Sequence, residues 1–179
     1  ELVGNAGMGK TRLLSEFRAE APDLPQLVTG CELYESSAPY LPVRRLLRLL
    51  LGTGAATHAS DVARRLEEDI RHRAPELLAW LPLLAMVADV EVPMTREVQD
   101  LGDAFRRAKL GEVTAEYLSR VITEPTLVVI EDAHWMDEAS VDLLRAVSLR
   151  ITGLPWLICI PRRDETTGCV EHPVILSPG

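Results

Sequence analysis

The chain has 179 residues with 19 basic and 27 acidic side chains, and its formal net charge of −8 argues against a nucleic-acid surface, which needs clustered basic residues. Hydrophobic residues make up 47% and charged residues 26%, a balance that predicts one folded domain rather than a disordered tail. The longest apolar run, Leu77 to Ala88, is shorter than the roughly 20 residues that cross a membrane, so we expect a cytoplasmic protein without membrane contact.

The first elements alternate between strand and helix patterns. Glu1 to Val3 reads as the end of a buried strand, and a strand at this position suggests that residues 1–179 are one domain of a longer protein. A short helix follows and is expected to end near Ala21 and Pro22. Gln26 to Cys31 predicts a second strand, and the leucines after Pro42 predict a helix that Gly52 closes.

Residues 53–124 are expected to form a helical insert between the second and third strands. Val62, Leu66 and Ile70 are spaced four apart, which is typical of the buried face of a helix. Gly111 weakens the prediction that the last helix is unbroken. The elements expected here are a charged helix over residues 60–72, an apolar helical stretch over 77–87, a loop over 88–102 and a long helix over 103–122.

The pattern changes at Thr126. Thr126 to Ile130 is almost continuously apolar, as in a strand buried on both faces of a parallel sheet. Asp137 is expected to cap the N-terminus of the next helix. Trp156 to Ile160 predicts another strand and Val174 to Leu176 a last one. Buried strands that alternate with helices predict an α/β fold.

A phosphate-binding motif occupies the loop after the first strand. The sequence matches G-x-x-x-x-G-K-[ST] in full, and the strand–helix context argues against the alternative of a chance match in a glycine-rich turn. Glycines permit backbone angles that a Cβ would forbid, so main-chain amides can wrap a polyphosphate. Lys10 is expected to contact the β and γ oxygens, and the Thr11 hydroxyl to bind Mg²⁺. The predicted nucleotide-binding residues are Gly4, Asn5, Ala6, Gly7, Met8, Gly9, Lys10 and Thr11.

An acidic pair, Glu131 and Asp132, follows the predicted third strand. Magnesium bound to a nucleotide needs a carboxylate, directly or through water, and the attacking water needs an orienting group. By position, Glu131 is expected to face the Mg²⁺ shell through water and Asp132 the attacking water. The usual order places Asp first, so slow hydrolysis is expected. The alternative is a polar strand end with solvated carboxylates.

Arginine follows the next strand, in the segment Ile160 to Asp164. Ligands of parallel sheets bind outside the carboxyl ends of the strands, so Arg162 is predicted to contact the γ-phosphate. A solvated basic loop explains the same residues equally well. His134 and Trp135 are interpreted as a surface histidine and an apolar cover over the start of the following helix.

Residues 131–140, with the sequence EDAHWMDEAS, resemble the (D/E)DxHWxDxxS signature of the AAA-like signal-transduction ATPases with numerous domains. The helical segment looks like that of the members attached to bacterial class III adenylate or guanylate cyclases. The further similar segments are Gly30 to Tyr34, Pro39-Tyr40, Leu81 to Leu84, Val92-Pro93, Phe105 to Arg107, Pro155-Trp156 and Arg162-Arg163.

The resemblance implies a three-layer P-loop NTPase sandwich with a parallel sheet of order 5-1-4-3-2. It also implies ATP and Mg²⁺ as ligands, and a regulatory module that controls a covalently attached cyclase domain. The alternative is the nucleotide-binding switch of a LuxR-type transcriptional regulator with little turnover. Nucleotide-dependent self-association is a further expectation. A small-molecule kinase is disfavoured because residues 53–124 show no obvious arginine-rich lid.

Overall fold

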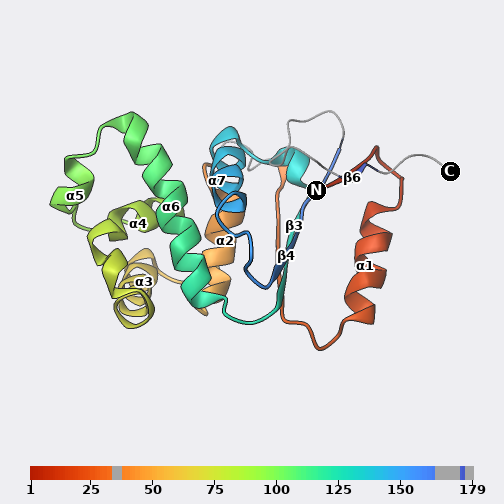
Figure 1. The fold of residues 1–179 in the computed structure, drawn as a ribbon, viewed down its shortest axis with the longest axis horizontal. Helices are drawn as coiled ribbons and strands as arrows, with labels where there is room; N and C mark the ends of the chain where they lie inside the picture. The colour runs from red at the N-terminus through yellow and green to blue at the C-terminus, as the bar shows by residue number, and fades with distance from the viewer. Residues whose placement is uncertain (34–37, 164–173, 176–179) are drawn as a thin grey trace.

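The structure is a computed structural model that describes residues 1–33, 38–163 and 174–175. It has an α/β fold in which parallel strands are flanked by helices, as predicted (Figure 1). Tyr34, Asp164 and Leu176, which belong to segments discussed above, lie outside the described residues.

The described strands form two three-stranded parallel sheets, with the orders β6-β1-β5 and β4-β3-β2. This differs from the predicted single sheet: the expected strand Trp156 to Ile160 is observed as β4, which pairs with β3, and the two residues after Ile160 form β5, which pairs with β1. Pro161, which has no amide hydrogen to donate to a neighbouring strand, stands where the partner changes. The strands are β1 (Leu2–Val3), β2 (Gln26–Gly30), β3 (Thr126–Glu131), β4 (Trp156–Cys159), β5 (Pro161–Arg162) and β6 (Val174–Ile175).

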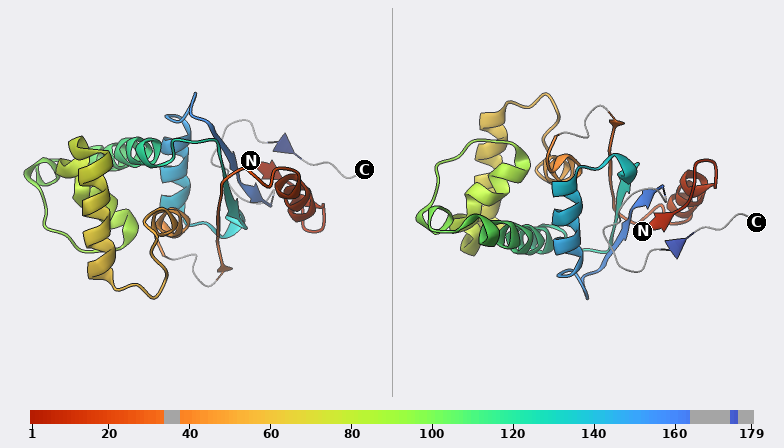
Figure 2. Two further views of the ribbon diagram at one scale, coloured as in Figure 1. Left: turned by 90° about the horizontal axis from the view of Figure 1, so that it is seen from below. Right: turned by 90° about the horizontal axis from the view of Figure 1, so that it is seen from above.

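The helices lie on both sides of the strands. One helix, α1, covers one face, α2 and α7 cover the other, and α3 to α6 lie beyond α2 and α7 (Figures 1 and 2). The helices are α1 (Lys10–Glu20), α2 (Leu41–Leu50), α3 (Ala59–Arg73), α4 (Leu81–Ala88), α5 (Arg96–Gln99), α6 (Asp103–Val121) and α7 (Glu138–Ser148), with the 3₁₀ helices η2 (Pro75–Trp80) and η3 (Ala133–Trp135).

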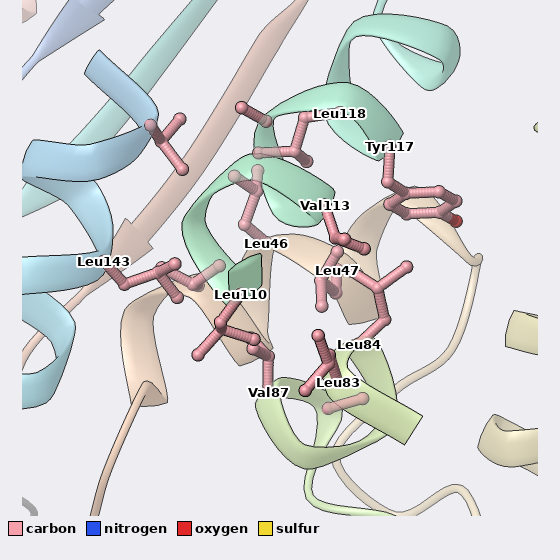
Figure 3. Close-up of a cluster of buried hydrophobic side chains, with 14 of the residues drawn as sticks. Leu46, Leu47, Leu83, Leu84, Val87, Leu110, Val113, Tyr117, Leu118 and Leu143 are labelled. Atoms are coloured by element: carbon pink, nitrogen blue, oxygen red, sulfur yellow. The ribbon is translucent and has the colours of Figure 1, made fainter. Parts of the chain in front are cut away.

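Two clusters of buried side chains flank β3. The larger lies between the helices and includes the fully buried Leu47, Leu84 and Tyr117 (Figure 3). Val128 and Ile130 of β3 join this cluster, whereas Leu127 and Val129 point to the other face and pack with Leu14 of α1. Strand β3 is therefore buried on both faces, as its composition predicted.

Two helical features differ in detail from the expected pattern, and the long helix expected over 103–122 is confirmed as α6. The apolar stretch over 77–87 belongs to two helices, the end of η2 and most of α4. The new helix starts at Leu81 because Pro82 fits the first turn of a helix, where its missing amide hydrogen breaks no hydrogen bond. The expected loop over 88–102 contains the four-residue helix α5. Helix α6 runs unbroken through Gly111, and a Cβ on this residue would lie 2.5 Å from the Cβ of Ala146. The glycine thus lets α6 approach α7 closely.

Candidate nucleotide-binding site

The phosphate-binding motif forms the loop between β1 and α1. Gly7 and Gly9 have φ angles of 82° and 79°, in the left-handed region that favours glycine. Gly9 is also the N-cap residue of α1, and its carbonyl accepts the amide of Leu13 at 2.9 Å. The amide hydrogens of the first turn of α1, which have no acceptor within the helix, therefore lie at the end of the loop. The helix dipole favours an anion at this position.

Lys10, the first residue of α1, folds back across this loop. Its Nζ donates to the carbonyl oxygens of Gly4, at 2.6 Å, and Asn5, at 2.9 Å. Neutral carbonyls hold an ammonium group more weakly than phosphate oxygens would, since ionised acceptors form stronger hydrogen bonds. The cation is thus held beside the loop by acceptors that a polyphosphate could replace.

One cavity of about 230 Å³ joins the phosphate-binding motif to the acidic pair. It lies where the carboxyl ends of β1, β3 and β5 meet. A larger cavity of about 600 Å³ runs between α6 and α7, but none of the described residues lining it belongs to either motif. The smaller cavity is lined by Ala6, Gly7, Lys10, Thr11, Leu14, Glu131, Asp132, His134, Pro161 and Arg163.

Glu131 is the last residue of β3. The alternation of side chains along the strand puts it on the same face as Leu127 and Val129, which is the face that α1 covers. Its half-exposed carboxylate lies 3.9 Å from the Nη1 of Arg18, which also donates from its Nε to the Gln26 side chain at 2.7 Å. Over the part of the chain that the structure describes, Glu131 thus has one long ion-pair contact, and it faces the side of the sheet on which Thr11 lies.

Asp132 stands in a left-handed turn, with φ at 52° and ψ at 38°. Asp is among the few residue types that adopt this conformation readily, because its short polar side chain can form local hydrogen bonds. The turn breaks the alternation of β3, so Asp132 lines the same cavity as Glu131. Its side chain is mostly exposed, and its Oδ1 lies 4.0 Å from the Nδ1 of the largely buried His134.

Comparison with protein-family models assigns most of this chain to one family. The model of the AAA ATPase domain matches residues 2–157, a span that contains the phosphate-binding loop and the acidic pair. The chain belongs to the AAA ATPase domain family. Membership implies ATP binding and ATPase activity. Comparison with curated proteins and with solved structures found no match for the chain. Over the described residues, no helix combines the length and the apolar character needed to cross a membrane.

The residues of this AAA ATPase domain fit a magnesium ion that is shared with a nucleotide. The Thr11 hydroxyl and the Glu131 carboxylate line one cavity with the phosphate-binding loop. Mg²⁺ is commonly held by one or two protein oxygens together with phosphates and water. Within residues 1–33 and 38–163, no group of three or more His, Cys, Asp and Glu side chains is placed to hold a metal. A magnesium ion at this cavity would be held by Thr11 and Glu131 together with phosphate oxygens and water.

The two adjacent arginines of the AAA ATPase domain point to different places. Arg162 is buried in β5, and its Nε donates to the Glu1 carboxylate at 2.9 Å, so it does not line the cavity. Arg163 lines the cavity, and its guanidinium carbon lies 5.8 Å from the centre of the Trp135 ring. Strand β5 ends at Arg162, and the Arg-Arg pair alone does not reveal where the strand ends or which of the two side chains faces the cavity.

Proposed function

We propose that this AAA ATPase domain binds ATP with Mg²⁺ at the loop formed by residues 4–11 and hydrolyses it slowly. The observation that carries the proposal is the single cavity of about 230 Å³ lined by Lys10 and Thr11 together with Glu131 and Asp132. A cation, a hydroxyl and two carboxylates around one phosphate-binding loop are the groups that phosphoryl transfer to water requires.

Each side chain has a proposed role. Lys10 exchanges the carbonyls of Gly4 and Asn5 for the β and γ oxygens of ATP. Thr11 and, through water, Glu131 would hold Mg²⁺, which when bound neutralises phosphate charge. Asp132 orients the attacking water, and its side chain is one methylene shorter than that of glutamate, so turnover is slow. We assign the contact with the γ-phosphate to Arg163 instead of Arg162, because Arg163 lines the cavity.

Nucleotide binding is tested with the two lysines of the chain. Lys10→Ala is expected to weaken ATP binding at least about tenfold, as for the loss of a charge-assisted contact of roughly 1.5–3 kcal/mol. Lys109→Ala is the matched control, because Lys109 pairs with Glu112 on α6 and lies over the Trp80 ring. Titration calorimetry measures both variants. An unchanged affinity in Lys10→Ala would refute binding at this loop.

Hydrolysis is tested with two aspartates. Asp132→Asn is expected to lower phosphate release about 100-fold or more while ATP still binds, as for a lost orienting or basic group. Asp142→Asn on α7 is the control, since Asp142 forms an exposed ion pair with Arg145. Phosphate release that survives in Asp132→Asn would assign the water to another group.

We infer the wider context from the resemblance alone. The AAA ATPase domain of residues 1–179, with its helical insert over about 53–124, would be the regulatory module of a longer bacterial signalling protein, with an adenylate or guanylate cyclase domain as the attached effector. The alternative effector is a LuxR-type helix-turn-helix, with the domain as a switch of little turnover. Translating the coding sequence on both sides of the domain distinguishes the two. Gel filtration with ATP and with ADP tests nucleotide-dependent self-association.

A further inference from the structure

Trp135 links the two sides of the candidate site. Its ring contacts the guanidinium of Arg163, which belongs to the segment after β5, while its own segment follows the acidic end of β3. We propose that Trp135 is a positioning residue that holds Arg163 toward the γ-phosphate, so that the domain distinguishes ATP from ADP. This inference rests on the proposed function, which supplies the nucleotide.

Trp135 is itself fixed in place. Its amide donates to the Asp132 carbonyl at 2.9 Å, within the turn that begins at the left-handed Asp132. Its partly buried ring packs against the larger hydrophobic cluster. The ring of His134 lies against it, with 4.7 Å between the ring centres and a tilt of 42°. The indole of Trp135 is therefore held in one position beside Arg163. The turn that contains Trp135 also contains Asp132.

The main chain of Arg163 is held by its neighbour. The Arg162 Nη1 donates to the Arg163 carbonyl at 3.0 Å, and the Arg162 Nε is bonded to Glu1. These contacts fix where the Arg163 side chain begins but not where its guanidinium lies. A long arginine side chain loses rotamer freedom when it is ordered, and contact with an aromatic ring reduces the freedom that remains to be lost on binding.

The consequence concerns one phosphate group. ADP lacks the γ-phosphate, so a contact that Arg163 makes only with this group raises the affinity for ATP and leaves that for ADP unchanged. If Trp135 acts through Arg163, removing the ring lowers the affinity for ATP alone. If Trp135 only stabilised the turn, removing its ring would lower the affinities for both ATP and ADP, because the turn and the phosphate-binding loop line the same cavity.

Titration calorimetry of the chain with ATP and with ADP, each with Mg²⁺, tests the inference. Trp135→Leu is expected to reduce the ATP-to-ADP affinity ratio about fivefold, and Trp135→Phe less, since the attraction to a cation falls from Trp to Phe. The matched control is Trp80→Leu, which removes the same kind of ring from beneath Lys109, 4.5 Å from its centre. The control is expected to keep the wild-type ratio.

A double variant decides whether the two side chains act as one unit. With Arg163→Ala present, adding Trp135→Leu is expected to cause no further loss of ATP affinity, because contacting groups are not additive. Additive losses overturn the inference, and so does an equal fall for ATP and ADP in Trp135→Leu. If Trp135→Leu fails to fold, Trp135→Phe replaces it in both measurements, with a smaller expected change and the same two contradicting outcomes. A failure of the proposed function is recognised separately, by Lys10→Ala with unchanged affinity for both nucleotides.

Discussion

The helical region of α2 to α6 and the edge of the sheet at the cavity are built in opposite ways. In the helical region, apolar side chains are fully buried and the charges of α3 form ion pairs along its exposed surface, such as Arg71 with Glu67 and Arg73 with Asp69. At the sheet edge, β1 and β5 contain two residues each, and the Glu131 carboxylate is half exposed with its ion-pair partner at 3.9 Å.

This difference separates stability from function. A buried aliphatic cluster has one well-packed arrangement, and its loss unfolds the domain. Short strands and half-exposed charged groups contribute less free energy, so they remain available to a ligand and can rearrange around it. We therefore expect substitutions in the helical region to change the free energy of unfolding and leave nucleotide affinity unchanged. Substitutions at the cavity should do the reverse.

The largest loss of stability is expected for Leu47→Ala. Leu47 of α2 is 0% exposed in the larger cluster, and truncating such a leucine costs about 2–5 kcal/mol. Leu49 of the same helix is 49% exposed, so Leu49→Ala is the matched control with an expected change below about 0.5 kcal/mol. Urea unfolding measures both. Similar losses in the two variants would contradict the packing described for α2.

A smaller loss is expected for Gly111→Ala. Alanine normally stabilises a helix by about 1 kcal/mol over glycine, but here its Cβ would lie 2.5 Å from that of Ala146. Forcing α6 away from α7 should outweigh the gain and destabilise the domain by about 1–3 kcal/mol. Gly54→Ala, where a Cβ meets nothing within 4 Å among the described residues, is the control. A stabilised Gly111→Ala would show that α6 and α7 can shift apart freely.

Sequence and structure agree where local chemistry determines the geometry. The geometry of the loop after β1 was predictable because the left-handed φ angles seen at Gly7 and Gly9 favour glycine. The helix over α3 was predictable because Val62, Leu66 and Ile70 repeat with the helical period, and all three are fully buried. The cap at Asp137 is also local, since its side chain accepts the amide of Ser140 at 2.9 Å.

The features that were missed depend on tertiary contacts. A four-residue helix such as α5 has no period to detect, and it is held by the buried Val98 and by Thr95, whose hydroxyl donates to the Ala79 carbonyl at 2.6 Å. The change of partner after Ile160, with β4 beside β3 and β5 beside β1, depends on strand pairing that the apolar pattern of residues 156–160 does not reveal. The sequence pattern likewise pointed to Arg162, whereas the structure shows that its neighbour Arg163, which follows the end of β5, lines the cavity.

A buried tyrosine makes the stability of the helical region depend on pH. Burial, and then the hydrogen bond to Asp69, raise the pKa of Tyr117, whose hydroxyl donates to the Asp69 Oδ2 at 2.7 Å. In the unfolded chain the hydroxyl ionises near its ordinary value of about 10. Its stabilising contribution is thus complete below pH 10 and is lost as the pH rises above that value.

The variant Tyr117→Phe tests this contact. At pH 7 it should destabilise the domain by about 1–2 kcal/mol, because Asp69 keeps its ion pair with Arg73 at 2.9 Å. Above pH 10 the variant should lose less stability per pH unit than the wild type. Urea unfolding between pH 7 and 11 measures both effects. Parallel pH profiles would mean that Tyr117 ionises in the folded state as readily as in the unfolded one.

The smallest effect is expected where the two regions meet. Helix α7 begins beside η3 at the cavity and packs along α6, and Asp137 caps its first turn through the amide and the hydroxyl of Ser140. Asp137→Ala should cost about 1 kcal/mol, and Glu138→Ala, next to the cap, close to nothing. Unfolding and calorimetry on the same samples measure stability and ATP affinity. If the cap only stabilises the helix, ATP affinity stays within about twofold of wild type, since the remaining packing of α7 holds the turn at Trp135. A larger loss of affinity in Asp137→Ala would mean that the start of α7 sets the geometry of the cavity. Residues at the start of α7 would then determine both the stability of the domain and its affinity for ATP.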